Sequence, residues 1–305
     1  MSALAGRRLA MYLALCLVWG STWLAIKIGL ADLPPLRFAA FRMALACVLV
    51  APFAIAAWRG GARPDAFEKR AIAWNGALQI GVQYTCIFIA EQWIESGVAA
   101  LLFATFPIWV GIFAHYLLPA EPLTRRTLAS AALGLAGVAV IESRALARIF
   151  DAETRPLLAG GALMVAASLV AGYANVLNKK HLGRVAPIHN VFGQTVVGSA
   201  MLLALAFAFE RGEAARWTPA ATGALVYLAV MGTALPFAGL FWLIPRVPVA
   251  VIGTIPVVDT VIAVALGALV LGEELSWRLF VGGALILGAV LLVARAGPQE
   301  HISES

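Results

Sequence analysis

Apolar segments about as long as a bilayer is thick follow one another along the 305-residue chain, separated by short polar joints. A helix needs roughly 20 mostly apolar residues to cross the hydrocarbon core of a membrane. We place ten such segments at residues 9–29, 35–57, 72–92, 97–118, 127–142, 157–177, 188–209, 220–243, 248–271 and 279–295. The sequence therefore predicts an all-α membrane protein with ten transmembrane helices.

Composition excludes the other broad classes of protein. Hydrophobic residues make up 62% of the chain and charged residues only 12%, whereas about 25% of a soluble domain is charged. The three cysteines all lie within apolar segments and are too few for a disulfide framework. The net charge of +6 is not gathered into a basic cluster with interleaved aromatic residues, so we expect no nucleic-acid partner. The expected partners are a small-molecule substrate and membrane lipids, and we expect a monomer.

Lysine and arginine are distributed unevenly between the two sides of the predicted bundle. With the N-terminus in the cytoplasm, 13 of these 22 residues fall on the inner side, 6 on the outer side and 3 within or at the edges of segments. Cytoplasmic loops of membrane proteins carry an excess of positive residues. The sequence therefore predicts a multi-pass protein of the cell inner membrane with both termini in the cytoplasm.

The two halves of the chain resemble each other at a constant offset of 152 residues. Polar, glycine and proline matches are more informative than apolar ones, and the offset aligns Gly20 with Gly172, Lys27 with Lys179, Pro35 with Pro187, Glu121 with Glu273 and Arg126 with Arg278. Each half holds five segments, an odd number, so the second half must enter the membrane upside down. We therefore expect two inverted five-helix repeats, residues 1–152 and 153–305, which is an architecture of secondary transporters.

Several short motifs carry a resemblance to a known family. They are Trp19-Gly-Ser21, Pro35-Leu-Arg-Phe-Ala-Ala-Phe-Arg42, Pro107 before Glu121-Pro-Leu-Thr124, and Gly272-Glu-Glu-Leu-Ser276. With these motifs the chain resembles the drug/metabolite transporter superfamily, in the branch with two EamA-type repeats. The resemblance implies ten helices, cytoplasmic termini, and export or exchange of small metabolites. Some similar members export aromatic amino acids, and we lean towards that group.

The second half departs from this pattern at two places. Ala171-Gly-Tyr173 replaces the tryptophan-glycine-serine motif, and Asp259 stands where the first half has Pro107. Ionisable residues within spans are expensive and are functional candidates by default. Asp259 is therefore expected either to face a cavity, where it binds an ammonium group or a proton, or to bond a structural partner such as Arg42.

Other basic residues within the spans have simpler interpretations. Arg42 lies seven residues into its segment, where we expect a structural partner or a lipid phosphate to accept from its five donors. Lys27 and Lys179 lie near opposite faces of the membrane, and we expect both side chains to extend to the interface.

The third segment carries a polar stripe. Gln79 and Gln83 are four residues apart and share one helix face, and Tyr84 follows them. A polar stripe is unfavourable against lipid, so we expect this helix to line a cavity. Glu91, at the end of the segment, is either part of an interfacial polar cluster or the mouth of that cavity.

Aromatic residues recur at helical spacing in the first and fourth segments. Trp19 and Trp23 are four apart, and Phe103, Phe106 and Trp109 are three apart. Such residues are packing or interfacial groups, or they are the walls of a cavity for an apolar, zwitterionic solute. The candidate substrate-binding residues are Gln79, Gln83, Tyr84, Glu91, Phe106, Trp109, Tyr173, Asn175, Trp242 and Asp259.

Motifs for other chemistry are missing from the sequence. There is no phosphate-binding glycine-rich loop, no histidine or cysteine spacing typical of a metal site, and no serine nucleophile motif. We therefore expect no enzyme activity and no cofactor. The favoured function is a secondary carrier that exports amino acids, aromatic or other apolar ones first, by alternating access. An importer, exchanger or channel of the same fold remains an alternative, as does a membrane scaffold or enzyme subunit.

Overall fold

A computed structural model describes residues 3–60, 63–118, 124–146, 151, 154–234, 236, 239, 243, 246–247 and 255–294. Within these residues all regular secondary structure is helical and there is no β-strand. The all-α prediction is therefore confirmed for the described part of the chain. Trp242, one of the expected site residues, lies outside the described residues.

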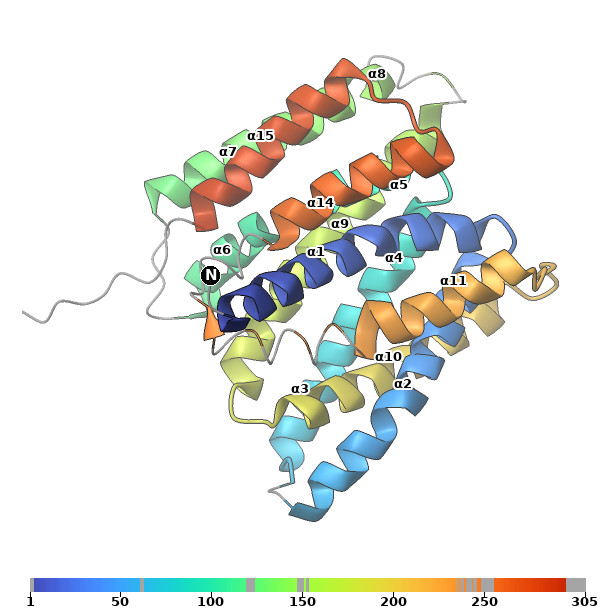
Figure 1. Ribbon diagram of the computed structural model, residues 1–305, viewed down its shortest axis with the longest axis vertical. Coiled ribbons are helices and arrows are strands. Elements are labelled where there is room, and N and C mark those ends of the chain that lie inside the picture. Colours follow the sequence, from blue (N-terminus) through green and yellow to red (C-terminus); the bar gives the residue numbers. More distant parts are fainter. Residues whose placement is uncertain are drawn as a thin grey trace, which may run out of the picture.

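The helices follow the predicted segments closely. In the first half they are α1 Ala3–Leu30, α2 Pro35–Gly60, α3 Ala66–Gly76, the π-helical turn η1 Ala77–Val82, α4 Gln83–Ala90, α5 Ser96–Phe103, α6 Phe106–Leu117, α7 Arg125–Ile141 and α8 Ser143–Leu146. In the second half they are α9 Arg155–Leu182, α10 Pro187–Phe209, α11 Pro219–Ala229, η3 Val230–Ala234, α14 Ile255–Leu266, η5 Gly267–Leu271 and α15 Trp277–Ala294. Figure 1 shows their arrangement.

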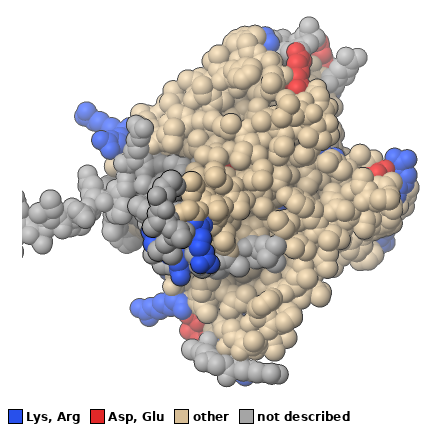
Figure 2. Space-filling model, viewed as in Figure 1, with Lys and Arg blue, Asp and Glu red and all other residues tan. Residues whose placement is uncertain are grey.

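The lengths and surfaces of these helices suit a bilayer. Five helical stretches are long and apolar enough to cross a membrane, and three shorter ones are also apolar. Large hydrophobic side chains are exposed along them, such as Phe53 at 69% and Leu269 at 83%. In Figure 2 the visible charged side chains lie towards the left, right and upper edges, and a broad uncharged surface lies between them. The number of ten crossings stays a prediction.

The fourth predicted segment consists of two helices rather than one. α5 ends at Phe103 and α6 begins at Phe106, with a turn in which the Thr105 hydroxyl donates to the carbonyl of Leu102 at 2.7 Å. Pro107 explains the break, because proline lacks an amide donor and its ring clashes with the carbonyl four residues earlier. The interruption frees backbone groups in the middle of the span.

Two π-helical turns lie at equivalent places in the two halves. η1 covers Ala77–Val82 and η3 covers Val230–Ala234. The offset of 152 residues places residues 77–82 on 229–234, so the two turns coincide. A π turn adds a residue to the helical turn and is frequent at functional sites.

Two pairs of helices that correspond through the offset, α7 with α15 and α2 with α10, pack together and run antiparallel. The start of α7 meets the end of α15, where Ser130 donates to the Ala289 carbonyl at 2.8 Å, and Arg278 donates to Ser143 at the opposite end. The start of α2 likewise meets the end of α10, where the Leu36 amide donates to Glu210 at 2.6 Å. Figure 1 shows α7 and α15 side by side at one edge of the molecule.

The aligned glycines Gly20 and Gly172 have the same packing role. A Cβ atom on Gly20 would lie 2.6 Å from the Asp259 carbonyl oxygen of α14, and one on Gly172 would lie 3.0 Å from the Val110 amide of α6. Only glycine allows each pair of helices to approach so closely. The offset relates α1 to α9 and α14 to α6, so the two contacts are equivalent.

One end of the bundle is fastened by carboxylates at helix N-termini. Glu210 accepts from the first amides of α2, and Glu273 accepts from the Ser96 amide and hydroxyl, both at 2.7 Å, and from the Gly97 amide at 2.9 Å. A negative charge at a helix N-terminus is favourable because the first amides have no partner within the helix. We call this end of the molecule the Asp32 end, after the residue in the α1–α2 loop.

Lys27 makes specific contacts that the sequence did not predict. Its ammonium group donates to the carbonyls of Glu91 and Ile94, both at 2.6 Å. These carbonyls lie at the end of α4, where helical partners are lacking. Lys27 therefore ties α1 to the α4–α5 turn at the Asp32 end. In the same region Asp32 pairs with Arg216 at 3.0 Å and accepts from Thr218.

Candidate functional site: a central cavity

A cavity of about 680 Å³ lies between the two halves of the bundle. Its walls come from α1, α2, η1 with α4, the α5–α6 break, α9, α10, η3 and the start of α14. The volume of the cavity lies within the range of small-molecule sites, about 300–1,000 Å³. The π turns η1 and η3 and the interrupted fourth segment contribute residues to its wall, whereas the third described π turn, η5, does not.

Six of the ten candidate residues from the sequence line this cavity: Gln79, Gln83, Tyr84, Phe106, Asn175 and Asp259. They come from both halves of the chain. Trp19, Trp23 and Phe103, which the sequence marked as aromatic candidates, line it as well. The expected polar stripe on the third segment therefore faces a cavity.

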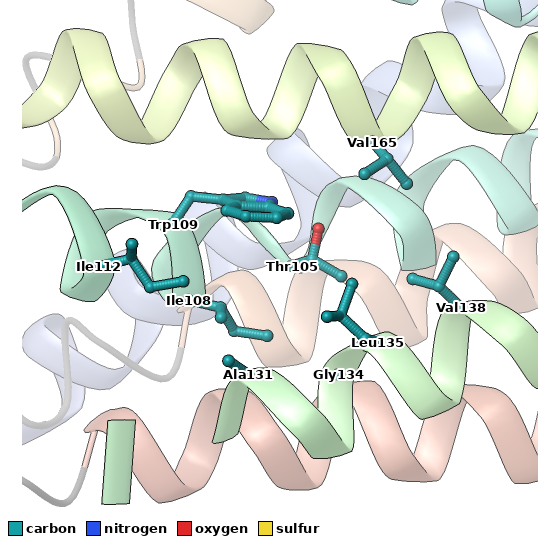
Figure 3. Close-up of a pocket in the computed structure, with 9 residues that line it drawn as sticks. All are labelled: Thr105, Ile108, Trp109, Ile112, Ala131, Gly134, Leu135, Val138 and Val165. Atoms are coloured by element: carbon teal, nitrogen blue, oxygen red, sulfur yellow. The ribbon is translucent and has the colours of Figure 1, made fainter. Parts of the chain in front are cut away.

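Trp109 lies outside the cavity although it follows Phe106 at helical spacing. Its indole nitrogen donates to the Ser168 hydroxyl of α9 at 3.0 Å. Figure 3 shows the indole among Thr105, Ile108 and other apolar groups that line a separate pocket of about 20 Å³. That volume suffices for about one water molecule. Trp109 therefore packs α6 against α9.

Tyr173 and Glu91 also lie away from the cavity wall. The Tyr173 ring packs edge-on against Phe113 with centroids 5.2 Å apart. Glu91 is fully buried, and both its carboxylate oxygens lack a hydrogen-bond partner among the described residues. Glu91 is thus neither an exposed interfacial group nor part of the cavity surface.

Three buried polar atoms on the cavity residues have no hydrogen-bond partner in the described structure. They are the Nε of Arg42, the Oε1 of Gln83 and the hydroxyl of Thr233. Buried polar groups are nearly always paired with protein or water. These three atoms are shielded from solvent, and the side chains that carry them line one cavity.

Asp259 contributes an acidic group to the same cavity. The Thr260 hydroxyl lies 3.3 Å from its carboxylate but also donates to the Pro256 carbonyl at the shorter distance of 2.7 Å, and within the described part of the chain no ion pair joins Asp259 to Arg42. A long hydrogen bond to a neighbouring hydroxyl compensates little of the cost of burying a charge. The cavity therefore contains a cation and an anion that are not bonded to each other.

Aromatic rings cover the first-half side of the cavity. The rings of Trp23 and Phe103 are 5.4 Å apart, and those of Phe103 and Phe106 are 6.1 Å apart and stacked. The Arg42 guanidinium lies 5.0 Å from the centre of the Tyr84 ring. The cavity can thus accommodate an apolar group beside polar ones.

Several cavity residues were not singled out from the sequence as binding groups, and some of them correspond to each other through the repeat offset. Arg42 and Gln194 correspond through the offset of 152 and both line the cavity, as do Trp23 and Asn175, and Ile80 and Gly232. Corresponding positions therefore meet around a common space, although their side chains differ in chemistry. No group of His, Cys, Asp or Glu that could hold a metal occurs among the described residues.

Comparison with known proteins agrees with this architecture. The sequence model of the EamA-like transporter family matches the chain twice, at residues 8–143 and 158–295. A solved crystal structure superposes with a TM-score of 0.61 at 20% identity, covering 96% of this chain and 99% of the other, so the two share a fold.

Curated relatives span nearly the whole chain. The Bacillus subtilis (strain 168) protein named Uncharacterized transporter YoaV is 26% identical over 92% of this chain and 94% of its own length. The Escherichia coli (strain K12) protein named Uncharacterized inner membrane transporter YedA is 28% identical over 92% of this chain and 88% of its own. The Streptantibioticus cattleyicolor protein named Probable terminal-alkyne amino-acid exporter is 27% identical over 91% of this chain and 90% of its own length. With both halves matched by one family model, this chain belongs to the EamA-like transporter family and is a multi-pass membrane transporter.

Proposed function

We propose that this protein is a secondary carrier that exports amino acids, with aromatic or other apolar ones favoured, through the central cavity. The observation that carries the proposal is the set of unpaired polar atoms on Arg42, Gln83 and Thr233, beside an aromatic wall. A solute with a polar end and an apolar side chain satisfies both parts. The relative named as a probable terminal-alkyne amino-acid exporter supports this substrate class.

We further propose that residues 1–152 and 153–305 form two inverted repeats with ten membrane crossings. The antiparallel contacts of α7 with α15 and of α2 with α10 support this, as do the coinciding π turns. The lysine and arginine bias puts both termini in the cytoplasm and the Asp32 end outside. One relative is named as an inner membrane transporter, which supports the same membrane for this protein.

Alternating access requires that helices around the cavity change their arrangement. The interrupted fourth segment and the turns η1 and η3 border the cavity and are the places where helices bend most readily. In the described structure the Asp32 end is held by Glu273, Glu210 and Lys27. We propose that release of these contacts opens the cavity to the outer side.

Transport in proteoliposomes tests the proposed function. Purified protein is reconstituted, and uptake of each of a panel of amino acids is measured with and without a proton gradient. We expect saturable transport of apolar and aromatic amino acids, and tolerance of toxic amino-acid analogues by cells that overproduce the protein. Absence of transport for every amino acid in the panel would contradict the proposal.

The alternatives of the same fold give different outcomes in that assay. A channel shows no counterflow, whereas a carrier or exchanger accelerates uptake of labelled substrate when unlabelled substrate is loaded inside. An obligate exchanger shows no net flux. Increased sensitivity of overproducing cells to toxic analogues would indicate import.

Topology is tested separately by labelling single cysteines with a membrane-impermeant reagent. The variants Arg184→Cys and Arg211→Cys are made in a background that lacks Cys16, Cys47 and Cys86. We expect labelling from outside at position 211 and none at 184. The reverse pattern would overturn the proposed orientation.

A further inference from the structure

We infer that Arg42 binds the carboxylate of the substrate, so that the cavity selects zwitterionic amino acids over the corresponding amides and amines. This inference rests on the proposed function and specifies the chemical class of its substrate. It differs from the interpretation that the sequence favours, in which Arg42 serves a structural partner or a lipid phosphate.

The position of Arg42 carries the first step. The residue is only 3% exposed, which excludes a lipid headgroup at the molecular surface, and it lines the cavity. Its Nε has no hydrogen-bond partner among the described residues. A guanidinium presents five donors in a fixed plane, which matches the two oxygens of a carboxylate.

The guanidinium is surrounded by aromatic rings, and the Tyr84 hydroxyl is a neutral acceptor within its reach. The guanidinium carbon lies 5.0 Å from the centre of the Tyr84 ring and 5.9 Å from that of Phe88. An aromatic ring attracts the charge, but it lacks the paired oxygens of a carboxylate. On a third side, a Cβ atom on Gly232 would lie 2.8 Å from Nη2, so the glycine leaves room for the guanidinium.

The buried acid Glu91 attracts Arg42 electrostatically, but among the described residues neither Glu91 nor Asp259 forms an ion pair with it. Both carboxylate oxygens of Glu91 are without a hydrogen-bond partner in the residues that the structure describes. A buried charge without a partner is unfavourable. A substrate carboxylate would remove that cost each time the cavity is filled.

The two repeats differ at both charged positions. Arg42 corresponds to Gln194 through the offset of 152, and Asp259 corresponds to Pro107. Among the described residues, the first half therefore contributes one cation to the cavity wall and the second half one anion. A ligand that carries a carboxylate and an ammonium group complements this arrangement, whereas an amine offers Arg42 no acceptor and an amide offers it one neutral acceptor.

Competition during counterflow tests the inference. Uptake of a labelled amino acid that the protein transports, phenylalanine first, is inhibited by unlabelled phenylalanine, phenylalanine amide or phenethylamine. The three competitors share a side chain and an ammonium group and differ at the carboxylate. With wild-type protein, we expect the amide and the amine to compete at least about tenfold more weakly than the acid, because a charge-assisted bidentate pair is lost.

Variants of Arg42 then assign the selectivity to this residue. Arg42→Gln should weaken competition by the acid at least about tenfold and make acid and amide compete equally. Arg42→Lys retains the charge without the planar fork and should recover part of the preference. Arg37→Gln is the matched control: Arg37 is on the same helix but donates to Glu210 and Glu213 at the Asp32 end, so the ratio of acid to amide should not change.

The outcomes separate the inference from the proposed function. If no amino acid is transported, both fail. If wild-type protein transports phenylalanine or another amino acid but its amide competes equally well, the inference is overturned and the proposed function stands. That comparison needs no variant, so it holds even if Arg42→Gln does not fold. Retention of the acid preference in folded Arg42→Gln would also overturn it.

Discussion

The interface between α7 and α15 and the wall of the central cavity are both buried within the same bundle, but they are built in opposite ways. In the interface, a Cβ atom on Gly137 would lie 2.7 Å from the Gly282 carbonyl oxygen, and one on Gly282 would lie 2.7 Å from that of Gly137. The polar Ser130 side chain is fully buried and bonded to Ala289. In the cavity wall, by contrast, three buried polar atoms have no partner.

From this difference we infer that the interface between α7 and α15 holds the bundle together, whereas the cavity wall serves the transport that we propose. Small residues let two helices touch along their length, and such packing drives association where lipid offers no hydrophobic effect. Unpaired polar groups in the cavity reduce stability unless something fills it. We therefore expect substitutions in the interface to affect folding, and substitutions in the cavity to affect transport.

The largest effect is expected for Gly137→Leu in the interface. The side chain would collide with the backbone of α15 at Gly282 and with Ile286, and overpacking of this kind costs about 3 kcal/mol or more. Membrane abundance of folded protein should be lost. The control is Ala136→Leu at the adjacent exposed position, which should accumulate like wild type. Normal abundance of Gly137→Leu would show that the two helices need not touch.

The next largest effect is expected for Asp259→Asn, which keeps the shape of the side chain and removes its charge. If Asp259 binds the substrate ammonium, apparent affinity should fall about tenfold or more, since hydrogen bonds to charged groups contribute about 1.5–3 kcal/mol. If it carries a proton instead, exchange should persist without dependence on the pH gradient. Proteoliposome kinetics at several pH values measure both.

Asp259→Asn is compared with Glu274→Gln, which removes a negative charge from an exposed loop. Glu274→Gln should match wild type in affinity and in pH response. If Asp259→Asn matches wild type as well, Asp259 is a helix–helix contact and has no part in the site.

A smaller effect is expected for Gln83→Leu. This change removes an unpaired acceptor from the cavity wall, so it should lower transport several-fold, about 1 kcal/mol, while abundance stays nearly the same. Gln92→Leu makes the same substitution at an exposed position and should leave transport unchanged. Equal losses of abundance and transport in Gln83→Leu would assign Gln83 a structural role.

The smallest effect is expected for Ser130→Ala in the interface. It removes one hydrogen bond to the Ala289 carbonyl and should lower the free energy of unfolding by about 1 kcal/mol. Transport per folded molecule should not change, because Ser130 is away from the cavity. Thermal unfolding in detergent and normalised transport measure the two quantities. A selective loss of transport would show that the interface takes part in the transport cycle.

Features that depend on local sequence were predictable. The apolar segments matched the helices because backbone groups in lipid must be bonded within the helix. Pro107 marks the break in the fourth segment, and the spacing of Gln79 and Gln83 placed both on the cavity face. The bonds from Lys27 to the carbonyls of Glu91 and Ile94 were not predictable, because these acceptors are distant in sequence.

The sequence by itself determined that this protein is helical, apolar along its length and built from two related halves. Only the tertiary structure decided which side chains share the cavity. Phe106 and Trp109 are one helical turn apart, yet the first faces the cavity and the second binds Ser168. When every face of a helix is apolar, periodicity does not reveal its rotation. Packing between distant helices fixes that rotation, and it brings Arg42 and Asp259 to the same cavity.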